Sequence, residues 1–196
     1  MSAVLHRREV VRAVLQRRKN LLVVAGLGST AWDCTAAGDS PLTFPMWGAM
    51  GNAAMVGLGL ALAQPARRVL VITGDGEMLM GMGSLATIGV RKPRNLAIVV
   101  IDNERYGETG MHATHTAAGV DLARVAGACG FRVTSLVRDR ASLGPLRAAI
   151  HALPGPLFAQ VKVAAEKLPL VLPPREGSLL KMRFRRALLG KAADLD

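Results

Sequence analysis

Cysteine and aromatic residues are scarce in this sequence. Among its 196 residues there are 2 cysteines, and aromatic residues make up 4%. Cys34 and Cys129 lie far apart and belong to no CxxC motif or Cys/His cluster. A small protein of an oxidising compartment would use its cysteines in pairs. We therefore expect both to be reduced residues packed in the interior of a cytoplasmic protein.

Long apolar runs are missing as well. The longest, at 53–63 and 96–101, are well short of the roughly 20 residues that a membrane-spanning helix needs. No signal peptide is visible. Although the N-terminal segment is basic, Val10, Val11 and Val14 recur at helical spacing, which predicts an amphipathic helix of a globular domain. We therefore expect no membrane partner.

Small and aliphatic residues are abundant instead: hydrophobic residues make up 51% of the chain, and 21 residues are glycine. This composition is too apolar for a disordered chain and is typical of α/β proteins, whose helices pack closely on a buried sheet. The length fits one domain. We predict a single domain over residues 1–196, of which 170–196 form a basic C-terminal extension.

The chain carries a formal net charge of +11. Nucleic acid is one partner that such a charge attracts, but the basic residues do not alternate with aromatic ones, and no nucleic-acid-binding motif is present. An anionic cofactor, an anionic substrate or an acidic partner subunit would use the same field. A solvated basic surface accounts for part of the charge, and we expect no nucleic-acid partner.

Apolar runs that favour buried strands alternate with helical patterns, which predicts a doubly wound parallel sheet flanked by helices. A polar, glycine-containing loop at 104–119 interrupts the alternation, and a loop of this length is usually functional. The segment at 41–45 is expected to be irregular. We expect strands at 21–25, 69–73, 96–101, 132–137 and 157–163, and helices at 4–18, 31–37, 52–63, 78–89, 120–127, 142–152 and 176–191.

Two neighbouring predicted strands end in residues suited to a metal-bound diphosphate. Gly74-Asp75-Gly76 follows one strand, and Asp102-Asn103 follows the next. Ligands of parallel sheets bind at the carboxyl ends of the strands. The glycines let the backbone approach a phosphate, and Asp75 and Asn103 offer the hard oxygens that Mg²⁺ prefers. Gly-Asp-Gly alone is common in turns, but one helix and one strand leading to Asp-Asn make the pattern specific.

This arrangement resembles the cofactor-binding motif of thiamine-diphosphate-dependent enzymes, which begins Gly-Asp-Gly and ends Asn-Asn. Asp102 departs from the first Asn of that ending, whereas Asn103 matches the second. The resemblance implies that Asp75 and Asn103 are side-chain ligands of Mg²⁺ and that Arg105 binds the metal through its backbone oxygen. It further implies cofactor contacts by Gly74, Gly76, Glu77, Tyr106 and Gly107.

Two upstream segments carry weaker matches. Gly48-Ala49-Met50 and the next glycine resemble the Gly-Ser-Met-Gly turn of the same enzymes, with Ala49 in place of serine. The resemblance implies that the Gly48 carbonyl accepts a hydrogen bond from the aminopyrimidine and that Met50, unbranched and polarizable, supports the bent cofactor. A lone methionine would more often be a core residue. Ser29 and Thr30 stand where the family places polar diphosphate contacts, although such residues more often begin a helix.

The resemblance covers residues 21–163 and corresponds to the diphosphate-binding domain of these enzymes. It is greatest to the β subunit of sulfopyruvate decarboxylase and the C-terminal half of phosphonopyruvate decarboxylase. Catalysis in the family needs a glutamate against the aminopyrimidine ring, supplied by a separate pyrimidine-binding domain. The chain has no room for such a domain, and its own glutamates lie in other contexts. The resemblance therefore implies a partner α subunit and a hetero-oligomer, without which the chain is inactive.

The implied function is a thiamine-diphosphate- and Mg²⁺-dependent decarboxylase of a small anionic 2-oxo acid. Two alternatives stay open: a subunit of a carboligase resembling acetolactate synthase, and a non-catalytic cofactor-binding module that regulates a partner. His112 and His115 lie in the loop after the metal motif, where a substrate would approach. They are either proton-relay or anion-binding groups, or ordinary loop residues.

Overall fold

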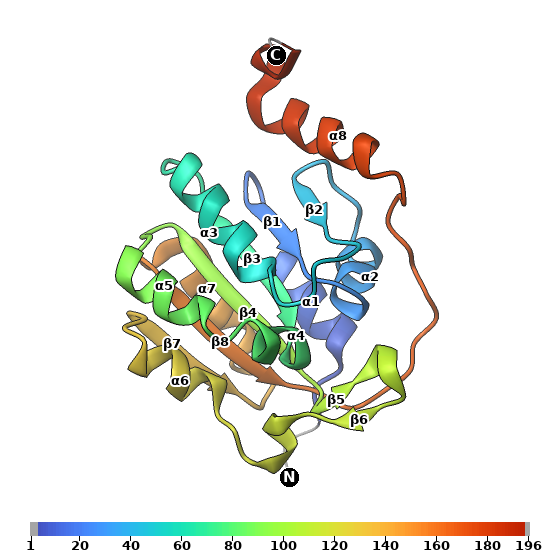
Figure 1. Cartoon of the computed structure of the whole chain (residues 1–196), viewed down its shortest axis with the longest axis vertical. Coiled ribbons are helices and arrows are strands. Elements are labelled where there is room, and N and C mark those ends of the chain that lie inside the picture. Colours follow the sequence, from blue (N-terminus) through green and yellow to red (C-terminus); the bar gives the residue numbers. More distant parts are fainter. Residues whose placement is uncertain (1–3, 195–196) are drawn as a thin grey trace.

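The computed structural model describes residues 4–194, and its centre is a sheet of six parallel strands in the order β2-β1-β3-β4-β8-β7 (Figure 1). Because all six run in the same direction, their carboxyl ends lie along one edge of the sheet. The strands are β1 (Leu22–Ala25), β2 (Thr43–Pro45), β3 (Val69–Gly74), β4 (Leu96–Asp102), β7 (Val133–Val137) and β8 (Leu157–Lys162). A separate antiparallel hairpin consists of β5 (Arg105–Tyr106) and β6 (His112–Ala113).

Helices cover both faces of this sheet, which confirms the predicted doubly wound α/β fold (Figure 1). Alternate residues of a strand point to opposite faces. The helices are α1 (Arg7–Leu15), α2 (Ser29–Ala36), α3 (Ala53–Ala63), α4 (Asp75–Met80), α5 (Ser84–Arg91), α6 (Leu122–Ala128), α7 (Leu143–Ala152) and α8 (Gly177–Leu189). Val23 and Leu70 belong to the core under α1, α2 and α7, whereas Val24 and Val71 belong to the core under α3, α4, α5 and α6. Short 3₁₀ helices span Gly107–Thr109, His115–Ala118 and Gly190–Asp194.

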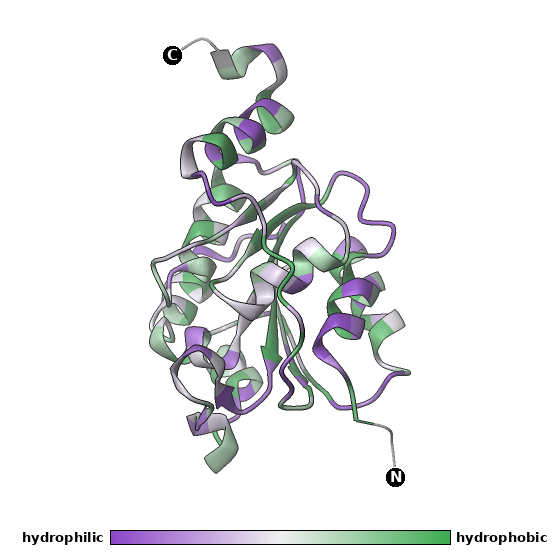
Figure 2. Ribbon diagram, turned by 90° about the vertical axis from the view of Figure 1, so that its right-hand side faces the viewer, coloured by the Kyte–Doolittle hydropathy of each residue, from purple (hydrophilic) through white to green (hydrophobic). Residues whose placement is uncertain are grey.

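The central strands are buried on both faces, which is why they form continuous apolar runs in the sequence. Figure 2 shows the apolar strands at the centre, between helices that mix polar and apolar residues. The small residues of α3 let that helix lie close to the sheet. A Cβ atom on Gly57 would stand only 2.2 Å from Cγ2 of Val71, so any larger residue there would push α3 away from β3.

Three predicted segments differ in the structure. The segment at 41–45 is not irregular but contains the edge strand β2, where Pro45 is tolerated because an edge strand needs fewer N–H donors. The helix predicted at 78–89 is divided into α4 and α5. Its break includes Gly81, where a Cβ would lie 1.9 Å from the Gly51 carbonyl oxygen, and this tertiary contact leaves no trace in the apolar pattern. The polar loop after β4 contains the β5–β6 hairpin.

The chain passes from β8 to α8 through residues 163–176, an extended segment that we call the C-terminal strap. It runs along the outside of the molecule (Figure 1). Phe184 of α8 packs against Phe44 of β2, with ring centroids 5.6 Å apart, and so helps to cover the edge strand. Trp47 Nε1 donates a hydrogen bond to the Pro174 carbonyl oxygen at 2.8 Å. These contacts attach the predicted C-terminal extension to the domain.

Both cysteines are free thiols, with Cys34 buried and Cys129 partly buried, as expected for interior residues. Within residues 4–194, no helix is long and apolar enough to cross a membrane. Residues 1–3 and 195–196 of the predicted domain lie outside the described residues.

Candidate active site

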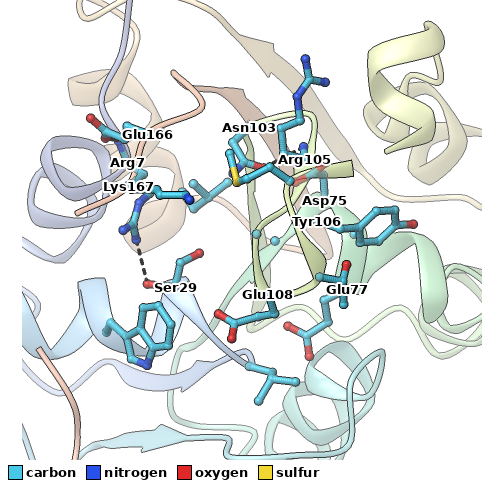
Figure 3. Close-up of a pocket in the computed structure, with 18 of the residues that line it drawn as sticks. Arg7, Ser29, Asp75, Glu77, Asn103, Arg105, Tyr106, Glu108, Glu166 and Lys167 are labelled. Atoms are coloured by element: carbon cyan, nitrogen blue, oxygen red, sulfur yellow. Dashed lines mark hydrogen bonds between the residues drawn. The ribbon is translucent and has the colours of Figure 1, made fainter. Parts of the chain in front are cut away.

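The loops at the carboxyl ends of β1, β3 and β4 border a cavity of about 390 Å³ (Figure 3). From β1 the sheet extends in both directions, because β2 lies on one side of β1 and β3 on the other. The helices that follow β1 and β3 lie on opposite faces, which opens a crevice between their loops. The β5–β6 hairpin and the C-terminal strap contribute the other walls.

Most of the predicted site residues meet in this cavity. They come from the start of α2, the turn before α3, the junction of β3 and α4, and the segment after β4. Segments that are far apart in the sequence therefore share one site, although their contacts with a cofactor stay predictions. The predicted residues that line the cavity are Ser29, Met50, Gly74, Asp75, Gly76, Glu77, Asn103, Arg105, Tyr106 and Gly107.

Three predicted residues do not line it. The Thr30 side chain is buried, and its hydroxyl donates a hydrogen bond to the Gly26 carbonyl oxygen at 2.8 Å. Thr30 thus fixes the beginning of α2, which argues against the predicted diphosphate contact. Gly48 and Ala49 are exposed beside Met50, and the turn holds Ala49 in the left-handed region, with φ of 59°. The predicted hydrogen bond of the Gly48 carbonyl stays a prediction.

Asp75, the first residue of α4, is 2% exposed and held by two hydroxyl groups. Its Oδ2 atom accepts a hydrogen bond from Thr114 at 2.6 Å, and the Thr116 hydroxyl lies 3.3 Å from the same atom. Burial raises the pKa of Asp75 to about 6, although the hydrogen bond from Thr114 opposes the shift. A divalent cation beside this carboxylate would favour its charged form.

Asn103 is oriented by its own turn, because its Oδ1 atom accepts a hydrogen bond from the Arg105 backbone N–H at 3.0 Å. No group of three or more His, Cys, Asp or Glu side chains in the described part of the chain is arranged to hold a metal ion. A cation at this wall would therefore need amide, backbone and ligand oxygens besides Asp75. That donor set fits the predicted shell for Mg²⁺, which diphosphate oxygens would complete.

The backbone around Asp75 forms a cradle without side chains. A Cβ on Gly74 or Gly107 would meet no atom within 4 Å, and both residues line the cavity, so a side chain there would extend into open space. Gly76 is required for a different reason: a Cβ there would lie 2.5 Å from Cε1 of Tyr106, whose ring covers the backbone. The open backbone at Gly74 and Gly107 fits a phosphate group at close range.

Residues 29–161 match the family described as "Thiamine pyrophosphate enzyme, C-terminal TPP binding domain". The chain belongs to this family. Thiamine pyrophosphate is another name for thiamine diphosphate, so the predicted family and the predicted cofactor are confirmed at this level.

Relatives of this thiamine-pyrophosphate enzyme chain include decarboxylases, as predicted. It is 35% identical to the β subunit of sulfopyruvate decarboxylase from Methanothermobacter thermautotrophicus, over 97% of this chain and 99% of the relative. It is 38% identical to phosphonopyruvate decarboxylase from Streptomyces viridochromogenes, over 78% of this chain but only 38% of the relative.

The X-ray structure of a protein assigned as a thiamin diphosphate-dependent enzyme from Mycobacterium smegmatis superposes with a TM-score of 0.70 at 23% identity. The match covers 84% of this chain and 33% of that chain. This chain therefore shares the fold of that solved structure over the matched region.

Asp102, which replaces the first Asn of the family motif, is a buried carboxylate within a polar network. It is 0% exposed and forms an ion pair of 2.8 Å with Lys162 of β8, its register partner. Gln160 Nε2 donates a hydrogen bond to Asp102 at 2.6 Å, and Thr116 donates another at 2.8 Å. Because Thr116 also reaches Asp75, the network joins the substituted position to the predicted metal ligand. Gln160 and Lys162 are polar residues in the otherwise apolar strand 157–162, and this signal for a buried polar network was missed in the sequence.

Glu77 lines the cavity, but the residue is only 4% exposed, and its carboxyl group lies between loops. Its Oε2 atom accepts a hydrogen bond from Thr73 at 2.7 Å, and a Cβ on Gly26 would lie 2.0 Å from the same oxygen. Burial raises the pKa of Glu77, whereas the hydrogen bond from Thr73 lowers it, as do the nearby backbone N–H groups of Gly51 and Leu27. The carboxyl group thus lies where the loops after β1 and β2 meet β3.

The cavity also contains residues that sequence reasoning placed elsewhere or missed. Glu108 and Glu166 line it, although neither was a predicted site residue. That the glutamate facing the aminopyrimidine comes from a partner subunit stays a prediction. Arg7 and Lys167 line it from outside the predicted motifs. The two loop histidines are exposed and are not part of the cavity wall, and their roles stay open.

Proposed function

We propose that the chain is the diphosphate-binding subunit of a two-subunit, thiamine-diphosphate- and Mg²⁺-dependent 2-oxo acid decarboxylase. One observation carries the proposal. The cavity gathers Asp75, Asn103 and the glycine cradle in a chain that aligns over nearly its whole length with the β subunit of a decarboxylase.

The bound cofactor would supply an electron sink for the cleavage of the bond to the carboxylate carbon. In this proposal Asp75 and Asn103 hold the metal ion, and Gly74 and Gly107 leave room for the phosphates. The hydroxyl of Thr114 keeps the Asp75 carboxylate in place. Water is excluded on one side by Tyr106, whose ring packs on the β3–α4 junction.

A partner subunit with a pyrimidine-binding domain is part of the proposal, and an exposed apolar surface supports it. Met50, Met80 and Met82 are all exposed. They lie on adjoining segments, because Gly51 packs against Gly81. Soluble monomers rarely expose several large apolar side chains together, and methionine-rich surfaces are common at interfaces.

The substrate class in this proposal is a small 2-oxo acid with a second anionic group. Sulfopyruvate and phosphonopyruvate, the substrates named for the two relatives, both belong to this class. The net charge of +11 favours the approach of such dianions. The second relative extends well beyond the region matched by this chain, which leaves space in that protein for the part that a partner would supply here.

The test is reconstitution of the full chain with the subunit that co-purifies with it. We expect CO₂ release from sulfopyruvate or phosphonopyruvate only when both chains, thiamine diphosphate and Mg²⁺ are present. Full activity of this chain alone would contradict the partner requirement. Acetolactate formed from pyruvate would favour the carboligase, and a reconstituted pair that turns over no 2-oxo acid would favour the regulatory module.

A further inference from the structure

Lys167 is a cavity residue that the proposed function does not use. It lies in the C-terminal strap, and Figure 3 shows its ammonium group pointing into the cavity from the side opposite Asp75. Among residues 4–194, no hydrogen bond or ion pair involves its Nζ atom. An ammonium group with three free donors at the wall of a cavity is a candidate ligand for an anion.

The strap is fixed on both sides of Lys167. The Oε1 atom of Glu166 accepts a hydrogen bond from the Arg7 backbone N–H at 3.3 Å, and its Oε2 atom lies 3.0 Å from His6 Nδ1. On the other side, the guanidinium group of Arg8 donates a hydrogen bond to the Pro169 carbonyl oxygen. Through these bonds the Glu166 carboxylate is held at the start of α1, and Figure 3 shows the Lys167 side chain pointing into the cavity.

Among the described residues of this wall, Lys167 is the cation without a partner carboxylate. The charges of Arg7 and Arg8 are balanced by the carboxylates of Asp33 and Glu166, and both Arg7 and Asp33 are buried. Arg7 also donates a hydrogen bond to the Ser29 carbonyl oxygen at 3.2 Å, which holds its guanidinium group at the cavity (Figure 3). Glu108 lies in the same cavity, but within the described residues no ion pair joins it to the strap.

Lys167 and Arg7 both lie outside residues 29–161, the segment that matches the cofactor-binding family. They are nevertheless within the region shared with the decarboxylase β subunit, which covers 97% of this chain. An anion-binding residue in this position would therefore not belong to the matched cofactor-binding segment.

We propose that Lys167, held in place by the docked strap, binds a tetrahedral oxyanion inside the cavity. This inference rests on the proposed function, because the oxyanion would be either the terminal phosphate of the cofactor or the sulfonate or phosphonate group of the substrate. Both sources present the same chemistry: a compact group with three oxygens that accept hydrogen bonds from an ammonium group.

Isothermal titration calorimetry of the full chain tests this with two probes. The first is pyrophosphate with Mg²⁺, and the second is sulfoacetate, added in the presence of thiamine diphosphate and Mg²⁺. We expect Lys167→Met to weaken the binding of one probe by about 10- to 100-fold, the usual effect of removing a hydrogen bond to a charged group. Loss confined to pyrophosphate assigns Lys167 to the cofactor, and loss confined to sulfoacetate assigns it to the substrate.

Two further variants serve as controls. Lys181→Met removes the same charge from an exposed position on α8 and is expected to leave both affinities unchanged. Lys167→Arg keeps the charge and is expected to retain most of the affinity. Melting curves establish that the variants fold.

The outcomes separate this inference from the proposed function. If the unaltered chain binds both probes and Lys167→Met binds them equally well, the inference is overturned and the proposed function stands. If the unaltered chain binds neither probe, the proposed function fails and the inference fails with it.

Discussion

The two sides of the cavity are built differently. The metal-side wall consists of the ends of β3 and β4, with Asp75, Asn103 and the buried network of Asp102, and it lies within the segment that matches the cofactor-binding family. The strap-side wall consists of the C-terminal strap and the start of α1, and it lies outside that segment. Asp75 and Asp102 are almost inaccessible, whereas Lys167 is exposed.

The two walls differ in how firmly they are held before a ligand binds. The buried carboxylates of the metal-side wall, Asp75 and Asp102, have several partners each, so this wall has its final geometry before any ligand arrives, which keeps the cost of binding low. The strap-side wall depends on a few hydrogen bonds along an extended segment, so a substitution there changes ligand preference with little effect on the fold. Changes in the two walls should therefore differ in whether they affect stability, binding or both.

The largest effect on binding is expected for Asp75→Asn in the metal-side wall. Asparagine keeps an acceptor for Thr114 and Thr116 but lacks the negative charge that holds a divalent cation. We expect at least a 100-fold loss of Mg²⁺-dependent affinity for thiamine diphosphate. Loss of an outer-shell partner of a metal already lowers affinity by up to about 100-fold, and Asp75 would bind the metal directly. Calorimetry with and without EDTA measures it. An unchanged affinity would refute the assignment of Asp75 as a ligand.

The largest effect on stability is expected for Lys162→Met, which leaves the Asp102 carboxylate buried without its cation. Breaking one side of a buried ion pair costs about 3–5 kcal/mol. The free energy of unfolding in urea measures the loss. The double variant with Asp102→Asn should recover most of it, because the amide needs no counter-charge and Gln160 and Thr116 remain in place. A double variant as unstable as Lys162→Met would contradict this account.

Gly74→Ala is expected to have smaller effects, which are favourable for stability and unfavourable for pyrophosphate binding. Gly74 has φ of −88°, which alanine adopts without strain, so the substitution should stabilise the empty chain by about 0.4–1 kcal/mol. Its methyl group would occupy the phosphate cradle and weaken pyrophosphate binding by about tenfold. Gly83→Ala is the matched control: its φ of −58° also suits alanine, its Cβ meets no atom within 4 Å, and it does not line the cavity. Equal binding losses in both variants would mean that the cradle is not the phosphate site.

The smallest effect on stability is expected for Glu166→Ala in the strap-side wall. The ion pair with His6 is partly exposed, and such pairs contribute at most about 1 kcal/mol. Loss of the hydrogen bond to Arg7 should nevertheless free the strap, so amide hydrogen exchange should accelerate at residues 163–170. Unchanged exchange there would show that Glu166 does not seat the strap.

The sequence allowed the metal-side wall to be predicted, because each strand end carries its own short signal. Asp75 and Asn103 follow apolar runs, and the parallel sheet brings such ends together. The Asp102–Lys162 pair was missed because nothing local connects residues on strands whose pairing is decided by the whole topology. Lys167 was missed for a related reason: the strap has neither helical nor alternating periodicity, and its position depends on contacts with α1.

The positions of the tryptophans give the chain its own optical probes. The chain has 2 of them. Trp32 lines the cavity, and the indole N–H of Trp47 donates a hydrogen bond to the Pro174 carbonyl oxygen of the strap. Emission from the first should respond when the cavity fills, and emission from the second when the strap detaches. A Trp47→Phe chain would thus let occupancy of the cavity be followed by fluorescence, without a label and before the partner subunit is known.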